Sequence, residues 1–244
     1  MKRAVIMGAT SGIGREVALL LLSEGWHVGI AGRREERLKQ IQALQPQSIA
    51  YEVIDVTRED APVLLQHLID KLGGMDLYLH CSGNGRYNPD LDPSLEKEVV
   101  RTNVNGFINM TNHAFRYFKE QKGGHLAAVT SVAGRRGIAL NALYSSSKRF
   151  QMTYLTALAQ LSHNGKYGIT ITDIQPGFVK TDFLHHSYPL MMKTPYVARK
   201  IVQGLRKGKR RVVIDWRYRV IVCVWHMIPG CIWEMINLQR FVSR

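Results

Sequence analysis

Short apolar runs alternate with amphipathic helical patterns along most of the chain. The apolar runs predict strands at residues 4–7, 27–31, 49–54, 77–80, 126–130, 169–174 and 212–214. Apolar residues at helical spacing predict helices at 14–23, 35–44, 61–72, 95–119 and 142–161. Strands that read as continuous apolar runs are buried on both faces, which is typical of a parallel sheet. The pattern therefore predicts an α/β fold in one domain, residues 1–244, with a seven-stranded parallel sheet and helices on both of its faces.

The composition of the chain is that of an ordinary globular protein. The 244 residues are 45% hydrophobic and 21% charged, which is typical of a chain that buries its own core. Three scattered cysteines, Cys81, Cys223 and Cys231, favour a reducing compartment over a disulfide framework. Neither a signal-peptide core nor an apolar run of about 18 residues is present in the sequence, so a cytoplasmic location is expected.

The net charge of +14 is concentrated near the end of the sequence. From Lys193 onward there are twelve basic residues against Asp215 and Glu234, a net charge of +10. A nucleic-acid-binding module usually distributes basic and aromatic residues over one recognisable fold. We therefore expect no nucleic-acid partner.

A glycine cluster follows the first predicted strand and precedes the first predicted helix. Glycine permits a tight turn and close backbone approach to a pyrophosphate, and the helix N-terminus adds free N–H groups. This context predicts a dinucleotide site of the Rossmann type, a doubly wound fold. Its contacts are expected from Gly8, Thr10, Ser11, Gly12, Ile13 and Gly14.

The residues after the second and third strands bear on the choice of cofactor. An NAD site is expected to carry Asp or Glu at the end of the second strand, whereas this chain has Arg33. Arg33, with Arg15 nearby, offers cations for a 2′-phosphate, which predicts NADP(H). Both arginines as solvated surface groups are the alternative. Asp55, with Val56 beside it, is expected at the adenine, or is an ordinary turn-forming aspartate.

Tyr144 and Lys148 are four residues apart, which places them on one face of a helix. A phenol with a pKa of about 10 is a poor acid or base at neutral pH unless a nearby cation stabilises its anion. Ser131 comes directly after a predicted strand, at the edge where doubly wound sheets bind ligands. These three residues predict acid–base chemistry.

Together these motifs resemble the short-chain dehydrogenase/reductase family, and in particular its compact single-domain members. The resemblance covers residues 2–209 and includes Asn103, which matches the family's catalytic asparagine. It implies that Tyr144 exchanges a proton with a carbonyl or alcohol oxygen, that Ser131 orients this oxygen, and that Lys148 lowers the tyrosine pKa and binds the nicotinamide ribose. Asn103 is implied to hold a water linked to Lys148. Further cofactor contacts are implied for Gly83, Pro176, Gly177, Val179 and Thr181.

Two segments differ from the family pattern or extend it. Residues 80–83 read His-Cys-Ser-Gly where the family usually has Asn-Asn-Ala-Gly. Residues 182–193 match the family's mobile lid, and their Phe, Leu, Tyr and Met side chains predict an adaptable apolar wall. The adjacent His185 and His186 are not expected to bind a metal, because neighbouring side chains rarely converge on one ion.

Residues 210–244 contain the last strand and a basic, apolar tail. Tryptophans beside arginines suit peripheral contact with a membrane or a cover over the substrate. Packing in a subunit interface or in the core is the alternative. Similar tails occur in family members that act on lipid-like or steroid-like compounds, so the resemblance implies an apolar substrate. It also implies a homodimer or homotetramer through helices 95–119 and 142–161. The rival hypothesis for function is a regulatory or scaffold protein that binds cofactor without turnover.

Overall fold

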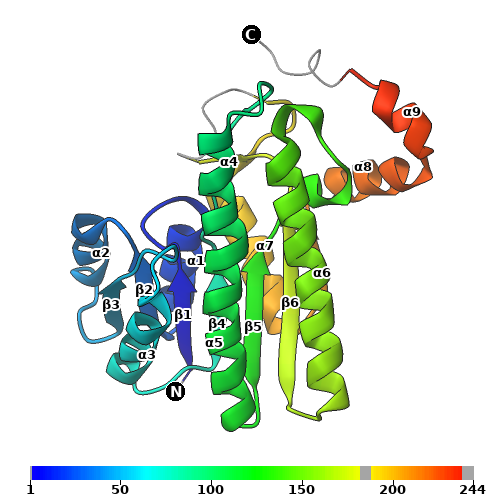
Figure 1. Ribbon diagram of the computed structural model, residues 1–244. Coiled ribbons are helices and arrows are strands. Elements are labelled where there is room, and N and C mark those ends of the chain that lie inside the picture. Colours follow the sequence, from blue (N-terminus) through cyan, green and yellow to red (C-terminus); the bar gives the residue numbers. More distant parts are fainter. Residues whose placement is uncertain (1, 182–187, 238–244) are drawn as a thin grey trace.

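The computed structural model describes residues 2–181 and 188–237 and is built around one seven-stranded sheet (Figure 1). Its strand order is β3-β2-β1-β4-β5-β6-β9, and every neighbouring pair is parallel. The strands are β1 (Arg3–Met7), β2 (His27–Gly32), β3 (Ile49–Val53), β4 (Leu77–His80), β5 (Gly124–Val129), β6 (Ile169–Pro176) and β9 (Arg211–Ile214). The predicted doubly wound fold is confirmed.

Helices cover both faces of this sheet. The helices on one face are α1 (Gly12–Ser23), α2 (Glu35–Gln42) and α7 (Thr194–Arg206). On the other face they are α3 (Ala61–Leu72), α5 (Phe107–Glu120) and α6 (Ala142–Asn164). Successive side chains of a strand point to opposite faces, so in β1 Ala4 and Ile6 join the first core, and Val5 and Met7 the second. The unbroken apolar runs of the strands follow from this double burial.

The predicted helix at 95–119 is interrupted at its centre. It consists of α4 (Pro93–Val99), a π-helical turn (Val100–Gly106) and α5. The hydrophobic pattern continues through the turn, which explains why periodicity alone predicted one helix. Single π-helical turns inside helices occur frequently at functional sites, and this one contains Asn103.

The chain after β6 adds smaller elements. Two short strands, β7 (Val179–Lys180) and β8 (Met192–Lys193), form a separate parallel pair that the sequence did not predict. Beyond β9, the tail forms α8 (Trp216–Met227) and α9 (Gly230–Met235), drawn in orange to red in Figure 1. Within residues 2–181 and 188–237, no helix is long and apolar enough to cross a membrane.

Candidate active site

The predicted site residues lie at the carboxyl edge of the sheet. The strand order reverses direction between β1 and β4, and doubly wound sheets bind their ligands in the crevice at such a switch point. The turn after β1 and the segment after β4 therefore meet at this crevice. The glycine turn leads from β1 into α1 there.

Close packing of the glycine turn explains its composition. Gly8 has a φ of +87°, and a Cβ on it would lie 2.8 Å from the backbone nitrogen of Ser82. A Cβ on Gly14 would lie 2.3 Å from the backbone oxygen of Gly8. Gly12, with a φ of +57°, packs against the Thr181 side chain, and a Cβ would lie 3.2 Å from its Cγ2. Only glycine fits these positions, and the turn leaves the N-terminus of α1 open to an anion.

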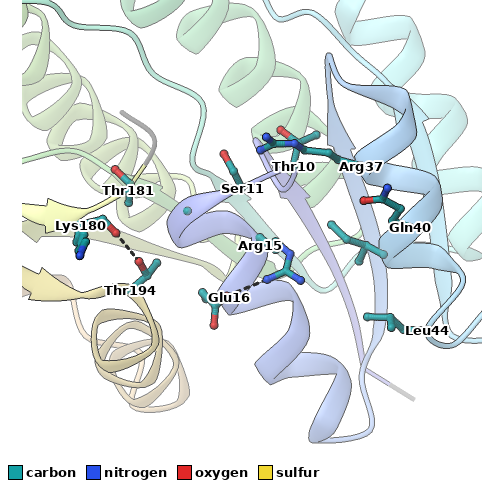
Figure 2. Close-up of a pocket in the computed structure, with 12 residues that line it drawn as sticks. Thr10, Ser11, Arg15, Glu16, Arg37, Gln40, Leu44, Lys180, Thr181 and Thr194 are labelled. Carbon is teal, nitrogen blue, oxygen red and sulfur yellow. Dashed lines mark hydrogen bonds and ion pairs between the residues drawn. The ribbon is translucent and has the colours of Figure 1, made fainter. Parts of the chain in front are cut away.

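A cavity of about 420 Å³ opens beside this turn (Figure 2). Thr10, Ser11 and Gly12 line it from the turn, and Lys180 and Thr181 from the segment after β6. Arg15 also lines it, and Figure 2 shows this side chain between α1 and α2. Ile13 is partly buried against the first core, so its side chain serves packing. The glycine cradle and the polar lining fit a dinucleotide phosphate group.

Arginines gather near the turn in an arrangement that sequence reasoning only partly anticipated. The Arg34 guanidinium donates to Thr10 Oγ1 from Nη2 at 2.6 Å and to Ser11 Oγ at 2.7 Å. Arg33 is exposed at the end of β2. Arg34, which the sequence analysis did not select, is thus the arginine that the structure places on the turn. Adjacent arginines cannot be ranked from sequence, because their side-chain directions depend on the backbone after β2.

Asp55 and Val56 follow β3, and their contact with adenine stays a prediction. Asp55 lies two residues beyond the end of β3, and its Oδ1 accepts from the backbone N–H and the hydroxyl of Thr57. This is the turn-forming role that was the alternative for this residue. Val56 is buried against Gly106, where a Cβ would lie 2.8 Å from the valine Cγ2. Val56 therefore anchors the π-helical turn to the chain after β3.

The four predicted catalytic residues come together from two elements and one loop. Asn103 lies in the π-helical turn, Ser131 follows β5, and Tyr144 and Lys148 are on α6. The ammonium nitrogen of Lys148 lies 5.8 Å from the centre of the Tyr144 ring. Gly83 lies beside the ammonium nitrogen, since a Cβ on it would be 3.4 Å away.

Tyr144 also packs on a residue that the sequence analysis did not select. A Cβ on Gly85 would lie 2.3 Å from the Tyr144 ring. The glycine therefore lets the backbone after β4 run flat against the phenol. Glycine occurs in loops for many structural reasons, so the sequence did not indicate that Gly85 packs on Tyr144.

Burial controls the titration of this cluster. It raises the pKa of Tyr144, and a hydrogen bond with Ser131 partly opposes that rise. It lowers the pKa of Lys148 to about 8, and the Coulombic interaction with Asp173 acts in the opposite direction. It also raises the pKa of Cys81 to about 12, which keeps this thiol protonated and non-nucleophilic. Without cofactor, burial therefore leaves the pKa of Tyr144 above its ordinary value. A lowering of this pKa by Lys148 stays a prediction.

The stretch after β6 is held by the tail. A Cβ on Gly177 would lie 2.0 Å from the Tyr218 ring, and the Tyr218 hydroxyl accepts from the Phe178 N–H at 3.0 Å. The same hydroxyl donates to the Leu190 carbonyl at 3.3 Å. Pro176 ends β6, and its carbonyl accepts from the Ser131 hydroxyl at 3.5 Å. Val179 is buried in β7.

The rest of the tail packs against the loop that follows Ser131. Arg136 donates from Nε to the carbonyl of Trp225 at 3.0 Å, near the end of α8. Trp233 on α9 donates from its indole N–H to the carbonyl of Gly137 at 2.8 Å. The inner face of α8 buries Tyr218 in the first core. The inner face of α8 therefore packs in the core, which was one of the alternatives for the tail.

The outer face of the tail is apolar and exposed. Exposed fractions are 69% for Trp216, 74% for Met227 and 84% for Met235. Contact of this face with a membrane stays a prediction, as does a dimer or tetramer through α5 and α6. Residues 182–187 of the predicted lid, including His185 and His186, lie outside the described residues. Beyond them, Tyr188 stacks on Phe178 with ring centres 4.3 Å apart.

Strand order and glycine turn together define a nucleotide-binding α/β fold, and comparison with known proteins narrows its class. Residues 2–189 match a family model described as short chain dehydrogenase. A protein described as an uncharacterized oxidoreductase from Myxococcus xanthus (strain DK1622) is 32% identical over 245 residues, covering 96% of this chain and 95% of its own. The chain belongs to the short-chain dehydrogenase/reductase family of oxidoreductases.

Solved structures show the same fold at lower identity. A variant of actinorhodin polyketide ketoreductase with NADPH is 23% identical, with a TM-score of 0.75 over 87% of this chain and 95% of the other. The protein ElxO with NADP bound is 22% identical, with a TM-score of 0.78 over 90% and 99% of the two chains.

Proposed function

We propose that this protein is an NADP(H)-dependent oxidoreductase that acts on a carbonyl or secondary alcohol, with Tyr144 as its acid/base. The observation that carries the proposal is the meeting of Asn103, Ser131, Tyr144 and Lys148 beside the glycine turn. Bound nicotinamide supplies or accepts the hydride. The protein supplies position and proton transfer.

Three of these side chains take part directly in the proposed reaction. Tyr144 donates its proton to the carbonyl oxygen in reduction and takes it back in oxidation. Ser131, which is hydrogen-bonded with Tyr144, orients that oxygen. The Lys148 ammonium stabilises the phenolate and binds the nicotinamide ribose. Because burial raises the pKa of Tyr144, the phenol is protonated at neutral pH, which is the state that donates a proton to a carbonyl oxygen.

The preference for NADP(H) rests on the arginines. Arg15 and Arg37 line the cavity beside the glycine turn, and Arg34 already binds the Thr10 and Ser11 hydroxyls. Arg33 precedes Arg34 and is exposed. Guanidinium groups bind phosphate through planar paired donors. Two of the structural relatives hold NADPH or NADP, which supports the same preference.

The substrate class is proposed from exposed aromatic and apolar side chains in the segments after β4 and β6. Phe178 and Tyr188 stack on each other, and Phe178 is 38% exposed. Tyr87 and Leu190 are also exposed, at 46% and 42%. Apolar and aromatic walls of this kind bind apolar ligands, so we propose a bulky apolar carbonyl compound.

A fluorescence titration with NADPH and NADH, followed by turnover on a carbonyl panel, tests the proposal. Tighter binding of NADPH than NADH is expected, with a weakening of about 10-fold or more in Arg33→Ala or Arg34→Ala. Arg58→Ala is the matched control, because Arg58 is exposed and pairs with Asp60. Absence of binding contradicts the proposal, and binding without turnover on any carbonyl supports the scaffold alternative.

A further inference from the structure

A buried glutamine connects the catalytic lysine to the π-helical turn. The Lys148 ammonium donates to Gln151 Oε1 at 3.0 Å and to the Val129 carbonyl at 3.2 Å. The Gln151 amide in turn donates from Nε2 to the backbone carbonyl of Asn103 at 2.9 Å. One side chain thus links α6 to the π-helical turn.

All three residues of this bridge are buried. Their exposed fractions are 4% for Lys148, 1% for Gln151 and 0% for Asn103. A buried polar atom without a hydrogen-bond partner is costly, and each end of the Gln151 amide satisfies one such atom. An apolar residue here would leave both the ammonium and the Asn103 carbonyl without this partner.

Gln151 lies on the same face of α6 as Tyr144 and Lys148. Tyr144, Lys148 and Gln151 occupy positions i, i+4 and i+7 of α6, which share one face. The side chain of Asn103 closes the network, since its Nδ2 donates to Ser147 Oγ at 3.0 Å. Ser147 donates to the Tyr144 carbonyl at 2.8 Å. The π-helical turn and the catalytic face of α6 are therefore joined at two points.

We propose that Gln151 is a positioning residue that holds the Lys148 ammonium toward Tyr144 by bridging it to the Asn103 carbonyl. The effect of Gln151 on catalysis rests on the proposed function. Its positioning of the Lys148 ammonium does not. Two of the three ammonium donors are engaged by Gln151 and Val129. This arrangement fixes the direction of the third.

Several titratable groups face the ammonium from the surrounding elements. His80 and Cys81 face it from the end of β4, Asp173 from β6, and Tyr144 from its own helix. Burial lowers the pKa of His80 to about 3 and raises that of Cys81 to about 12, so both are neutral across the working pH range. The Asp173 carboxylate is identical in all Gln151 variants. Differences among those variants therefore report on residue 151.

Three substitutions separate positioning from packing. Gln151→Met keeps the length of the side chain and removes both hydrogen bonds. Gln151→Ala leaves room for a water, which has two polar partners there and restores the bridge. Gln151→Glu keeps the acceptor for Lys148 and adds a negative charge. Met152→Leu is the control, because this neighbouring core residue lies in the same helix.

The first readout is the pKa of Lys148 in the protein without cofactor, measured by NMR of ¹³Cε-labelled lysine. The Lys148 resonance is assigned by its loss in Lys148→Met. The pKa is expected to fall by about one unit in Gln151→Met, to stay near the wild-type value in Gln151→Ala and Met152→Leu, and to rise in Gln151→Glu. An unchanged value in both Gln151→Met and Gln151→Glu overturns the proposal.

The second readout is kcat/KM for carbonyl reduction as a function of pH. Gln151→Met is expected to lose about 10-fold or more, and its alkaline limb moves to lower pH, whereas Gln151→Ala loses about 3-fold or less. A packing role predicts the reverse order, because methionine fills the space and alanine does not. That reverse order refutes positioning. If the wild type reduces no carbonyl, the proposed function fails and the NMR series still decides the role of Gln151.

Discussion

Replacing Tyr218 by phenylalanine removes one hydroxyl that links the tail to Phe178, before the predicted lid, and to Leu190, within it. This hydroxyl accepts from the Phe178 N–H at 3.0 Å and donates to the Leu190 carbonyl at 3.3 Å. The side chain is 4% exposed, and its ring packs flat on Gly177. Phenylalanine keeps the ring contact, so the substitution isolates the two hydrogen bonds.

The expected loss of stability follows from the two backbone groups that lose the Tyr218 hydroxyl as a partner. A partly buried N–H without its acceptor costs about 1–3 kcal/mol, whereas the Leu190 carbonyl belongs to an exposed residue and loses little. We therefore expect Tyr218→Phe to lower the free energy of unfolding by about 1–3 kcal/mol. In a chain of this length that lowers Tm by roughly 2–6 °C.

Urea and thermal unfolding of Tyr218→Phe measure this loss. Tyr51→Phe is the matched control, because the Tyr51 hydroxyl on β3 has no hydrogen-bond partner within residues 2–181 and 188–237, and a change within about 0.5 kcal/mol is expected. A Tyr218→Phe protein as stable as the wild type would refute the reasoning that the hydroxyl secures Phe178.

Four further outcomes are expected. Tyr144→Phe should reduce turnover by at least about 10²-fold with NADPH affinity nearly unchanged, and retained turnover in a steady-state assay would sink the proposed mechanism. Gly14→Ala should abolish NADPH binding or destabilise the fold, because its Cβ would lie 2.3 Å from a backbone oxygen, while Gly230→Ala, with open space, should do neither in titration and unfolding experiments. The lowered pKa of Lys148, about 8 against an ordinary 10.5, means that the unfolded chain binds more protons between these values. The free energy of unfolding should therefore rise across that range by up to about 3 kcal/mol, and titration of Lys148→Met should lack the rise. A chain ending at Asp215 should lose liposome sedimentation if the exposed outer face of α8 contacts membrane, and unchanged sedimentation would remove the membrane hypothesis.

Much of the fold was predictable because it depends on local signals. A strand buried on both faces must be apolar throughout, and seven such runs between helices define the sheet. Glycines at 8 and 14 were predictable for a related reason, since a Cβ there would meet backbone atoms at 2.3–2.8 Å, and Gly12 adopts a positive φ of +57°. The spacing of Tyr144 and Lys148 is likewise a property of one helix.

Features that depend on distant segments were not predictable. Arg33 and Arg34 are equivalent in the sequence, and only the path of the backbone after β2 places Arg34 on Thr10 and Ser11. The π-helical turn at Asn103 has the same hydrophobic pattern as the α-helix around it. Its register is associated with Val56 packed on Gly106, a contact across about 50 residues.

The sequence by itself determined which chemical groups the protein has, their order and the sheet that carries them, because these follow from local geometry and hydrophobic periodicity. Only the tertiary structure decided which groups touch. It placed Gln151 between Lys148 and Asn103, and it placed the Tyr218 hydroxyl on Phe178. Burial, which lowers the pKa of Lys148 and raises that of Tyr144, is a property of the packed molecule and of no segment alone.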